Sequence, residues 1–459
     1  MTPGARAQAS IELLDQIFQA WNSEKRIPAD KLLQNYFKSH RFIGSKDRGA
    51  VSELVYWVLR HKAALEWWLA EKFKSPVHAR AIVLTALMLR KDFTVAELAA
   101  ITQDSQYSLP SLTPPEKLRC EELYKHCHPE AQPKDLSSEQ PSKILRGAQD
   151  DKDMPDPVRL NYPEWLDGQL RETFGKDFEK ALHALNEQAP TDLRVNTLKT
   201  TREALQQQLK NEGFETEPTP LSPIGLRLSK RGPVFTTEAF KKGHFEVQDE
   251  GSQMAALMTD TSPGMRVIDF CAGAGGKTLA MAAQMKNKGR ILAWDTSEKR
   301  LAQIVLRLRR AGVDNVQTHV IESESDAFIK RHKQTADRVL VDAPCSGTGT
   351  WRRNPDLKWR FTPKDLEEVV VLQQSILQSA ARLVKPGGRL IYATCSVLRA
   401  ENEHQVDRFL KSAPNFKVVC AEKVWNKNAT MNENEVSYLS LTPHEDGVDG
   451  FFAAVFERA

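Results

Sequence analysis

Two cysteines in the C-terminal half of the chain each follow a short apolar run that predicts a β-strand. Cys345 comes after the run 338–342, and Cys395 comes after the run 389–393. If the two strands are neighbours in a sheet, their ends lie about 5 Å apart and both thiols face one pocket. A cysteine thiolate is a strong nucleophile, so this placement indicates covalent chemistry. For either cysteine taken alone, a buried small apolar side chain is the alternative interpretation.

Such a pair of thiols suits methyl transfer to carbon 5 of a cytosine. That carbon is too poor a nucleophile to accept a methyl group from a sulfonium donor unaided, and attack of a thiolate on carbon 6 activates it. After transfer, a base removes the carbon 5 proton and the thiol leaves. Asp342, three residues before Cys345, could contact N3 and N4 of the ring, and in a protonated state it could donate to N3. A carboxylate that caps the loop is its alternative role.

The attacking cysteine must ionise, and a free cysteine has a pKa of about 8.5. It therefore needs an electropositive or hydrogen-bonding environment. Lys385 and Arg389 shortly precede Cys395, but the sequence does not show that either cation reaches the thiol.

A glycine-rich loop follows the apolar run 266–270 and precedes a helical pattern. Its sequence is Cys271-Ala272-Gly273-Ala274-Gly275-Gly276-Lys277. Glycines let the backbone turn sharply and approach a ligand closely. The next apolar run ends in Asp295, 19 residues after Gly276, where an acid can bind ribose hydroxyls. The loop fits S-adenosylmethionine; a nicotinamide dinucleotide remains an alternative although the third glycine of its pattern is replaced by Thr278, and a purely structural turn is another.

Short apolar runs alternate with helical patterns from Val247 to the C-terminus. The strand candidates are 266–270, 290–294, 316–321, 338–342 and 389–393. Strands that alternate with helices predict a parallel, doubly wound sheet, in which ligands bind at the carboxyl ends of the strands. The expected fold class is therefore α/β, with a Rossmann-like domain and a mostly parallel sheet.

The chain before this domain divides into three further parts. Residues 1–130 predict an all-α domain, because Leu14, Ile17, Phe18 and Trp21 recur at helical spacing and residues 51–59 repeat the pattern. Residues 131–158 are polar and predict a linker. Residues 159–245 predict a small α+β module with a strand near 193–196 and a helix over 201–214, and the catalytic domain spans 246–459. The basic residues of 41–48 could touch RNA phosphates, or form a solvated turn.

The composition excludes several classes of protein. Over 459 residues, 41% are hydrophobic and 27% are charged, as in globular proteins with about three domains. No apolar run is long enough for a membrane span and the start lacks a secretory signal, so we expect a cytoplasmic protein. The six cysteines contain no CxxC pair, and Cys120, Cys127 and His128 fit no common zinc pattern, so no metal is expected. A net charge of +4 is compatible with a polyanionic partner and does not prove one.

Several motifs between Tyr162 and the C-terminus occur together. They are Leu193-Arg194-Val195-Asn196, Val247-Gln-Asp-Glu-Gly-Ser-Gln253, the loop 271–277, Asp342-Ala-Pro-Cys345-Ser-Gly-Thr-Gly349, Arg352-Arg-Asn-Pro-Asp-Leu-Lys-Trp359, Tyr392-Ala-Thr-Cys-Ser396 with Glu401-Asn402, and Asp449-Gly-Phe-Phe452. Together they resemble the RsmB/Nop/Sun (Fmu-type) family of RNA cytosine-C5 methyltransferases, and especially its bacterial RsmB-like members, which act on 16S rRNA.

The resemblance implies roles for individual residues. The loop 271–277 and Asp295 would hold S-adenosylmethionine, with Asp342 between the cofactor and the base; Arg300 is a further cofactor-binding candidate. Cys395 would be the nucleophile, and Cys345 would assist product release. DNA cytosine methyltransferases use the cysteine of a Pro-Cys pair, so a second cysteine after Thr394 points to RNA. The module 159–245 resembles the family's RNA-contacting extension, and residues 1–130 resemble a NusB-like domain.

The chain departs from the family pattern at two places. The usual loop is CAAPGGK, whereas Gly273 and Ala274 stand here in place of Ala and Pro, which predicts a looser loop that keeps its backbone contacts. After the third strand the family carries an acid that contacts the adenine part of the cofactor. Here Glu322 directly follows the strand and is our choice, with Asp326 as the alternative.

The leading hypothesis is an RNA cytosine-C5 methyltransferase, with 16S rRNA as the expected substrate and transfer RNA as the second choice. A non-catalytic RNA-binding or ribosome-assembly factor and a dinucleotide-dependent oxidoreductase are the alternatives. The intact Cys395 and glycine loop disfavour the first, and the missing third glycine disfavours the second. The family resemblance implies a monomer.

Overall fold

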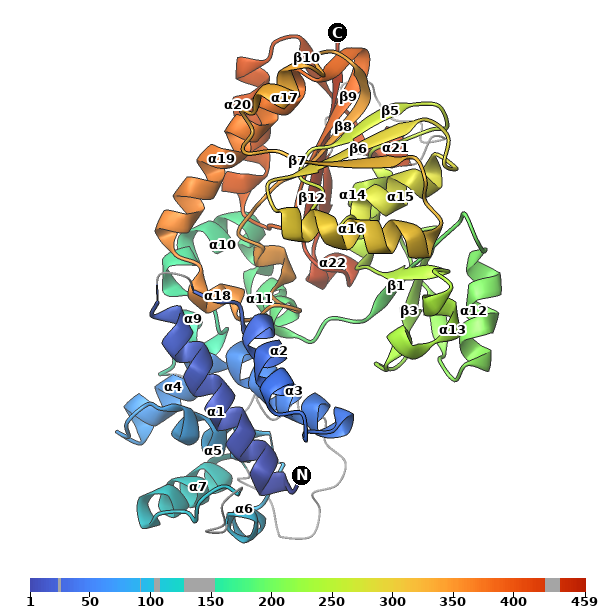
Figure 1. The fold of residues 1–459 in the computed structure, drawn as a ribbon. Coiled ribbons are helices and arrows are strands. Elements are labelled where there is room, and N and C mark those ends of the chain that lie inside the picture. Colours follow the sequence, from blue (N-terminus) through green and yellow to red (C-terminus); the bar gives the residue numbers. More distant parts are fainter. Residues whose placement is uncertain (24–25, 91, 103–107, 128–152, 426–437) are drawn as a thin grey trace. The chain divides into compact units, whose positions relative to one another are not determined.

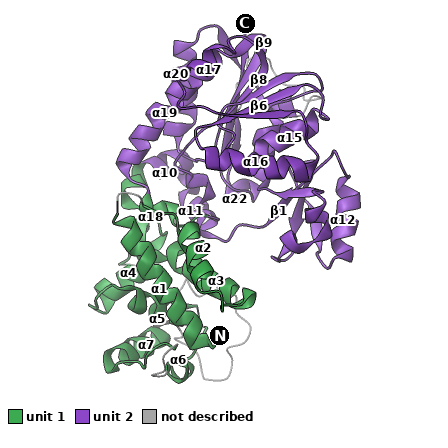
Figure 2. Ribbon diagram, in the orientation of Figure 1, with its two compact units in different colours: residues 1–168, 354–360 green, residues 169–353, 361–459 purple. Residues whose placement is uncertain are grey.

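The computed structural model describes residues 1–23, 26–90, 92–102, 108–127, 153–425 and 438–459 (Figure 1). The chain forms two compact units, one of residues 1–168 with 354–360 and one of residues 169–353 with 361–459 (Figure 2). Most of the predicted linker 131–158 lies outside the described residues. Within the described ranges, no helix is long and apolar enough to span a membrane.

The first unit is all helical, as the apolar spacing predicts. Leu14 and Ile17 of the first long helix and Val51 and Val58 of the third are fully buried in one apolar core. Its elements are α1 (Pro3–Trp21), α2 (Ala29–Ser39), α3 (Ser45–Arg60), α4 (Lys62–Trp67), η1 (Trp68–Lys72), α5 (Ala79–Leu89), α6 (Val95–Ile101), α7 (Pro114–Cys127), α9 (Asp156–Arg159), η2 (Glu164–Leu166) and α18 (Leu357–Arg360).

The short helix α18 belongs to this unit although it is far from it in sequence. The indole N–H of Trp359 donates to the carbonyl of Leu59 at 2.7 Å. The ammonium of Lys358 is buried and donates to the carbonyl of Asn161 at 3.0 Å. The domains predicted from the sequence are consecutive ranges, and they do not include residues 354–360 in the helical unit.

The second unit contains a small antiparallel sheet in the order β2-β3-β1-β4. Its strands are β1 (Asp192–Val195), β2 (Thr216–Pro218), β3 (Gly225–Leu228) and β4 (Phe245–Val247). The predicted helix is present as α12 (Arg202–Asn211), whose Leu205 and Leu209 pack with Leu193 and Val195 of the central strand. Helices α10 (Asp167–Phe174), α11 (Phe178–Asn186) and α13 (Glu238–Lys241) flank these strands in sequence. The expected α+β character of this region is confirmed.

The large sheet has the strand order β10-β12-β9-β8-β5-β6-β7, with β11 paired to β12. Its strands are β5 (Arg266–Asp269), β6 (Arg290–Asp295), β7 (Val316–Val320), β8 (Ala336–Asp342), β9 (Val384–Thr394), β10 (Phe416–Val419), β11 (Leu439–Leu441) and β12 (Phe451–Arg458). The pairs from β7 to β9 are parallel, and β12 is antiparallel to β9, β10 and β11. The predicted mostly parallel, Rossmann-like sheet is therefore confirmed.

Helices cover both faces of this sheet (Figure 1). On β8, Leu340 packs in one apolar cluster with α14 (Glu250–Leu257) and α15 (Gly276–Gln284). Its neighbours Val339 and Val341 pack in the other cluster with α19 (Pro363–Ala381) and α20 (Glu403–Ser412). Because successive strand residues point to opposite faces, one strand contributes to both cores. The remaining elements include α16 (Glu298–Ala311), α17 (Ala327–Lys330), α21 (Ala421–Trp425) and α22 (Pro443–Asp446).

Candidate active site

The carboxyl ends of β5, β6, β8 and β9 surround a cavity of about 470 Å³ in the second unit. The strand order reverses at β5, which pairs with β6 on one side and β8 on the other, and such a switch point is where doubly wound sheets bind ligands. The cavity brings together most of the residues that the sequence singled out: Cys271, Gly273, Lys277, Asp295, Arg300, Asp342, Cys345 and Cys395.

The glycine loop turns through backbone conformations that favour glycine. Gly273 has φ +55° and Gly275 has φ +82°, and Gly275 caps the N-terminus of α15. A Cβ at Gly275 would lie 2.9 Å from the side chain of Ile304, whereas a Cβ at Gly273 would meet nothing within 4 Å. Gly273 therefore leaves open space on the cavity side of the loop, which fits a bound cofactor.

Two arginines hold the carbonyls of this loop, and no sequence pattern assigns either of them this role. Arg194 of β1 donates to the carbonyl of Gly276 at 2.5 Å, and Arg307 of α16 donates to that of Ala274 at 2.6 Å. Burial lowers the pKa of Arg194 to about 10. The expected looser loop thus has charged side chains that fix its shape.

Asp295 ends β6 as a buried carboxylate on the cavity wall. Its oxygens accept from the backbone N–H groups of Gly273 and Ser297, both at 2.8 Å, and Arg300 lies 3.0 Å away. A carboxylate has about four lone-pair sites, so these three contacts leave capacity for another donor. This arrangement is suited to binding a ribose hydroxyl.

Lys277 supplies the cation that the sequence analysis sought elsewhere. Its ammonium donates to Asp342 at 2.7 Å. Burial lowers the pKa of Lys277, but the negative charges of Asp342 and Cys395 outweigh burial and raise it above its usual value. Toward this ammonium Asp342 accepts a hydrogen bond rather than donating one.

Lys385 and Arg389 are paired with other carboxylates. Lys385 forms an ion pair with Asp337 at the opposite end of β8. Arg389 lies 3.3 Å from Glu457. Both cations are thus engaged at that end of the sheet, whereas Lys277 lines the cavity together with Cys395 and interacts with it electrostatically.

The two thiols meet in the cavity, as their strand positions predict. The Sγ atoms of Cys345 and Cys395 lie 3.4 Å apart, because β8 and β9 are adjacent and parallel. The pKa of Cys345 is raised well above its usual value, first by its hydrogen bond to Cys395 and then by burial. Either sulfur could donate the hydrogen bond that joins them, and the raised pKa favours the protonated thiol at Cys345.

A buried glutamate joins the loops that follow the two cysteines. Glu401 accepts from the backbone N–H of Ser346 at 2.8 Å, from the hydroxyl of Ser396 at 2.5 Å and from the amide of Gln373 at 3.0 Å. Ser346 and Ser396 each directly follow one of the cysteines. Asn402 adds a bond to the carbonyl of Ser396 at 2.9 Å. The Glu401-Asn402 pair, known from the sequence only as part of a motif, thus positions both thiols.

The acid of the turn after β7 that lines the cavity is not the one chosen from the sequence. Glu322 is exposed and does not line the cavity. Asp326 accepts from the N–H groups of Glu322 and Phe328 and caps α17, and these bonds lower its pKa. Glu324 does line the cavity, and its carboxylate accepts from Ser375 at 2.9 Å. The turn after β7 brings this third acid to the cavity, which linear spacing could not reveal.

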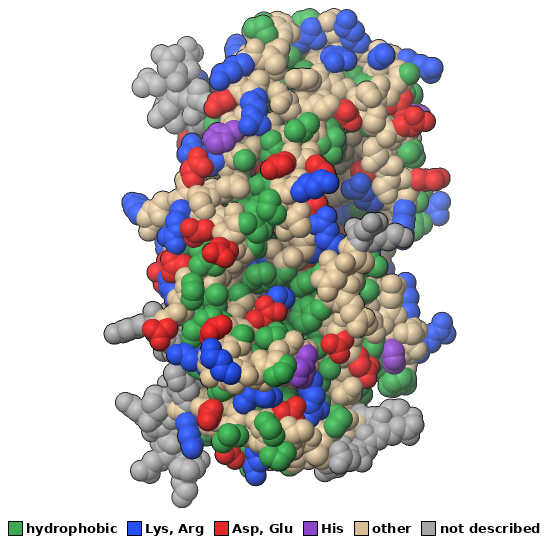
Figure 3. Space-filling view, turned by 90° about the vertical axis from the view of Figure 1, so that its left-hand side faces the viewer, with side chains coloured by type: hydrophobic (Ala, Val, Ile, Leu, Met, Phe, Trp, Pro, Cys, Tyr) green, Lys and Arg blue, Asp and Glu red, His purple; other side chains and the backbone are tan. Residues whose placement is uncertain are grey.

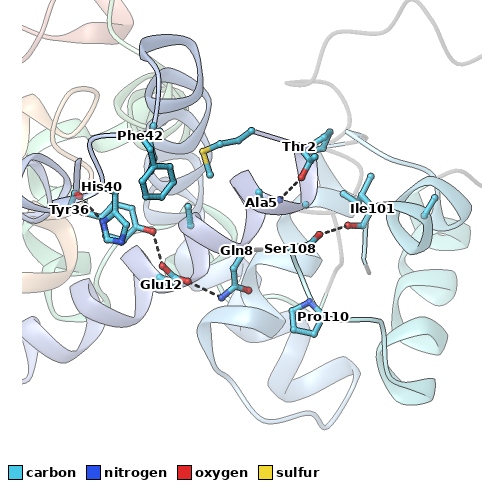
Figure 4. A pocket seen from close by; sticks show the side chains of 16 residues that line it. Thr2, Ala5, Gln8, Glu12, Tyr36, His40, Phe42, Ile101, Ser108 and Pro110 are labelled. Atoms are coloured by element: carbon cyan, nitrogen blue, oxygen red, sulfur yellow. Dashed lines mark hydrogen bonds between the residues drawn. The ribbon is translucent and has the colours of Figure 1, made fainter. Parts of the chain in front are cut away.

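A larger cavity, of about 1110 Å³, lies in the first unit (Figure 4). Its polar groups bond to one another: Tyr36 donates to Glu12 at 2.7 Å, and Gln8 donates to the same carboxylate at 3.1 Å. None of the candidate catalytic or cofactor-binding residues lines it. Size alone therefore does not identify the chemical site.

The surface face drawn in Figure 3 mixes both signs of charge. Lys and Arg side chains are interspersed with Asp and Glu there. The charge on this face therefore does not by itself assign a path for RNA.

Comparisons with known proteins find related methyltransferases. A family model described as 16S rRNA methyltransferase RsmB/F matches residues 256–457, and a ferredoxin-like domain of RsmF/B-like methyltransferases matches residues 162–235. A probable ribosomal RNA small subunit methyltransferase B from Synechocystis sp. is 32% identical over 90% of this chain and 92% of its own length. A protein of the same name from Bacillus subtilis is 30% identical over 92% of each chain. The crystal structure of a methyltransferase homolog protein from Pyrococcus horikoshii is 29% identical, covers 66% of this chain and 98% of its own, and has a TM-score of 0.57.

Proposed function

Because the chain belongs to the RsmB/F family of 16S rRNA methyltransferases, we propose that it methylates carbon 5 of a cytosine in RNA of the small ribosomal subunit. The observation that carries this proposal is the 3.4 Å separation of the Cys345 and Cys395 sulfurs in the cavity that the glycine loop also lines. A single thiol would suffice for attack, and the second provides for release.

The family is S-adenosylmethionine-dependent, and the residues here fit that cofactor. Gly273, with open space above it, the loop held by Arg194 and Arg307, and the Asp295 carboxylate would hold it. Bound there, it supplies a methyl group made electrophilic by its sulfonium sulfur.

The chain's own residues would prepare the cytosine. The Cys395 sulfur forms a bond to carbon 6, and the electrons of the carbon 5–carbon 6 double bond shift so that carbon 5 becomes nucleophilic. Lys277 favours the attacking thiolate and the Asp342 carboxylate accepts from the N4 amino group of the base. Carbon 5 then takes the methyl group.

Release requires a base and a leaving group. Once Cys395 is bonded to carbon, its hydrogen bond with Cys345, the largest of the influences that raise the pKa of that thiol, is weakened and its charge is lost. Cys345 can then lose its proton to solvent and, as a thiolate, take up the carbon 5 proton while the bond between carbon 6 and sulfur breaks. The double bond reforms, and Cys395 leaves as a thiolate.

The test uses RNA of small ribosomal subunits from a strain that lacks this gene. The purified protein with S-adenosylmethionine should protect one cytosine from bisulfite conversion, and a Cys395→Ala variant should protect none. Transfer RNA from the same strain serves as the comparison substrate. Protection of a transfer RNA cytosine alone would replace the rRNA assignment, and methylation at an atom other than carbon 5 would overturn the chemistry.

A further inference from the structure

A second cavity of the same unit lies next to the candidate active site. It measures about 390 Å³, and its lining includes Ser396, Val397 and Asn402, which closely follow the nucleophile in the chain. Phe451 lines both this cavity and the one that holds the thiols. An RNA strand that presents a cytosine to Cys395 therefore has a second recess within reach of a neighbouring nucleotide.

Three polar atoms of residues that line this recess lack hydrogen-bond partners within the described part of the chain. They are Nδ1 of His444, Oε2 of Glu403 and Oγ1 of Thr442. The His444 side chain is only 5% exposed. A buried polar group without a hydrogen-bond partner is energetically unfavourable. Terminal torsions of Glu and His turn readily, so these groups can meet a ligand that enters.

The charge of the recess selects the chemistry of that ligand. Four carboxylates line it, from Glu172, Asp177, Glu403 and Glu445, against the single guanidinium of Arg399. Arg399 already lies 3.6 Å from Glu172. Carboxylates repel a phosphate and accept from N–H groups, so the recess suits the edge of a nucleobase rather than the RNA backbone.

Flat side chains complete the recess. The rings of Phe174 and His444 pack edge to face with centroids 5.5 Å apart, and both residues line it together with Phe451. Unstacked bases of single-stranded RNA are commonly held on such rings. Among the bases, guanine presents two adjacent donors, N1–H and the N2 amino group, which match the two oxygens of one carboxylate.

We propose that this recess binds a guanine next to the target cytosine, with the Glu403 carboxylate accepting from N1–H and N2–H. This inference rests on the proposed function, because it places the recess beside a cytosine that reacts with Cys395. Glu403 is a specificity-determining residue in this proposal and takes no part in the methyl transfer.

The test uses the full-length protein and short RNAs that carry the bisulfite-mapped cytosine. Guanine, inosine or adenine is placed in turn at the 5′ and the 3′ neighbour, and both kcat/KM and equilibrium binding by fluorescence anisotropy are measured. At one neighbour, guanine should be preferred over adenine by about fivefold or more, with inosine between them. Glu403→Gln should remove this preference, and the exposed Glu367→Gln should keep it.

The outcomes separate the two proposals. Equal kcat/KM and equal binding for all bases at both neighbours, or a guanine preference that Glu403→Gln leaves intact, overturns the recess proposal while cytosine methylation stands. If no RNA is methylated at carbon 5, the proposed function fails; binding of single-stranded RNAs that carry one cytosine with guanine, inosine or adenine on either side then decides whether guanine is selected. A Glu403→Gln protein that loses its cooperative unfolding is replaced by His444→Gln, which should weaken guanine binding in the same assay.

Discussion

The ammonium of Lys277 donates to the carboxylate of Asp342 at 2.7 Å and so connects the glycine loop to the strand that leads to Cys345. Lys277 is therefore part of the glycine-rich loop and also interacts electrostatically with Cys395. The loop and the reacting base would consequently be aligned by a single ion pair.

Lys277→Met should slow alkylation of Cys395. Removing the cation takes away the positive charge that interacts with Cys395, so the alkylation rate at pH 7 should fall by about tenfold. Iodoacetamide labelling followed by peptide mass spectrometry measures this. The matched control is Lys385→Met, whose ammonium pairs with Asp337 and should leave the rate unchanged. An equal effect of both variants would contradict the assignment of Lys277.

Cys345→Ala should trap a covalent complex between protein and RNA. Attack by Cys395 still occurs, but the group that supports removal of the carbon 5 proton is missing. A band of reduced mobility on a denaturing gel is the expected result. Cys395→Ala and the double variant should give no such band and no methylation. Normal turnover by Cys345→Ala without an adduct would refute the division of roles between the thiols.

Asp295→Ala should weaken S-adenosylhomocysteine binding by about tenfold or more, because it removes the carboxylate that would accept hydrogen bonds from the ribose hydroxyls. Isothermal titration calorimetry measures the affinity, with Glu298→Ala, an exposed acid in the first turn of α16, as the control. The native protein should show no binding of NAD under the same conditions. Unchanged affinity in Asp295→Ala would reject the ribose role.

Glu401→Gln should destabilise the protein and reduce methyl transfer together. The carboxylate is fully buried and accepts from Ser346, Ser396 and Gln373, so an amide nitrogen in its place faces donors. The free energy of unfolding should fall by about 1–3 kcal/mol in urea titrations. Glu367→Gln is again the exposed control. An unaltered unfolding midpoint would show that the cysteine loops do not depend on this residue.

Asp269→Asn should change how stability depends on pH. Burial raises the pKa of Asp269 to about 7, whereas an unfolded Asp titrates near about 3.9. A raised native pKa means that the native state holds the proton more tightly than the unfolded state. The contribution of this proton to the free energy of unfolding is therefore complete below about pH 4 and is lost as pH rises through about 7. The free energy of unfolding of Asp269→Asn minus that of the native protein should therefore be larger at pH 8 than at pH 4, as measured by urea titration at each pH. The same difference between the two proteins at both pH values would contradict this prediction.

Much of the second unit was predictable because its signals are local. Each parallel strand is a short apolar run, and Cys345, Cys395 and Asp295 lie at strand ends, where parallel strands bring side chains together. The prediction that the two thiols meet required their strands to be neighbours, and the order β5-β8-β9 shows that they are.

The remaining features depend on contacts distant in sequence. Lys277 could be assigned to a cofactor loop, but its reach to Asp342 and Cys395 follows from the helix that starts at Gly276. Glu324 lines the cavity because of the turn after β7, whereas Glu322 was chosen because it directly follows the predicted strand. The recess of Glu403 and His444 combines segments whose patterns show no shared signal.

The membership of residues 354–360 in the first unit has a practical consequence for dissecting the protein. Two separate segments of the chain form that unit. Dividing the gene after residue 168 would therefore separate Trp359 and the buried Lys358 from the carbonyls to which they donate. Neither fragment would then be self-sufficient. Domain-exchange chimaeras must therefore carry both segments of the helical unit, residues 1–168 and 354–360.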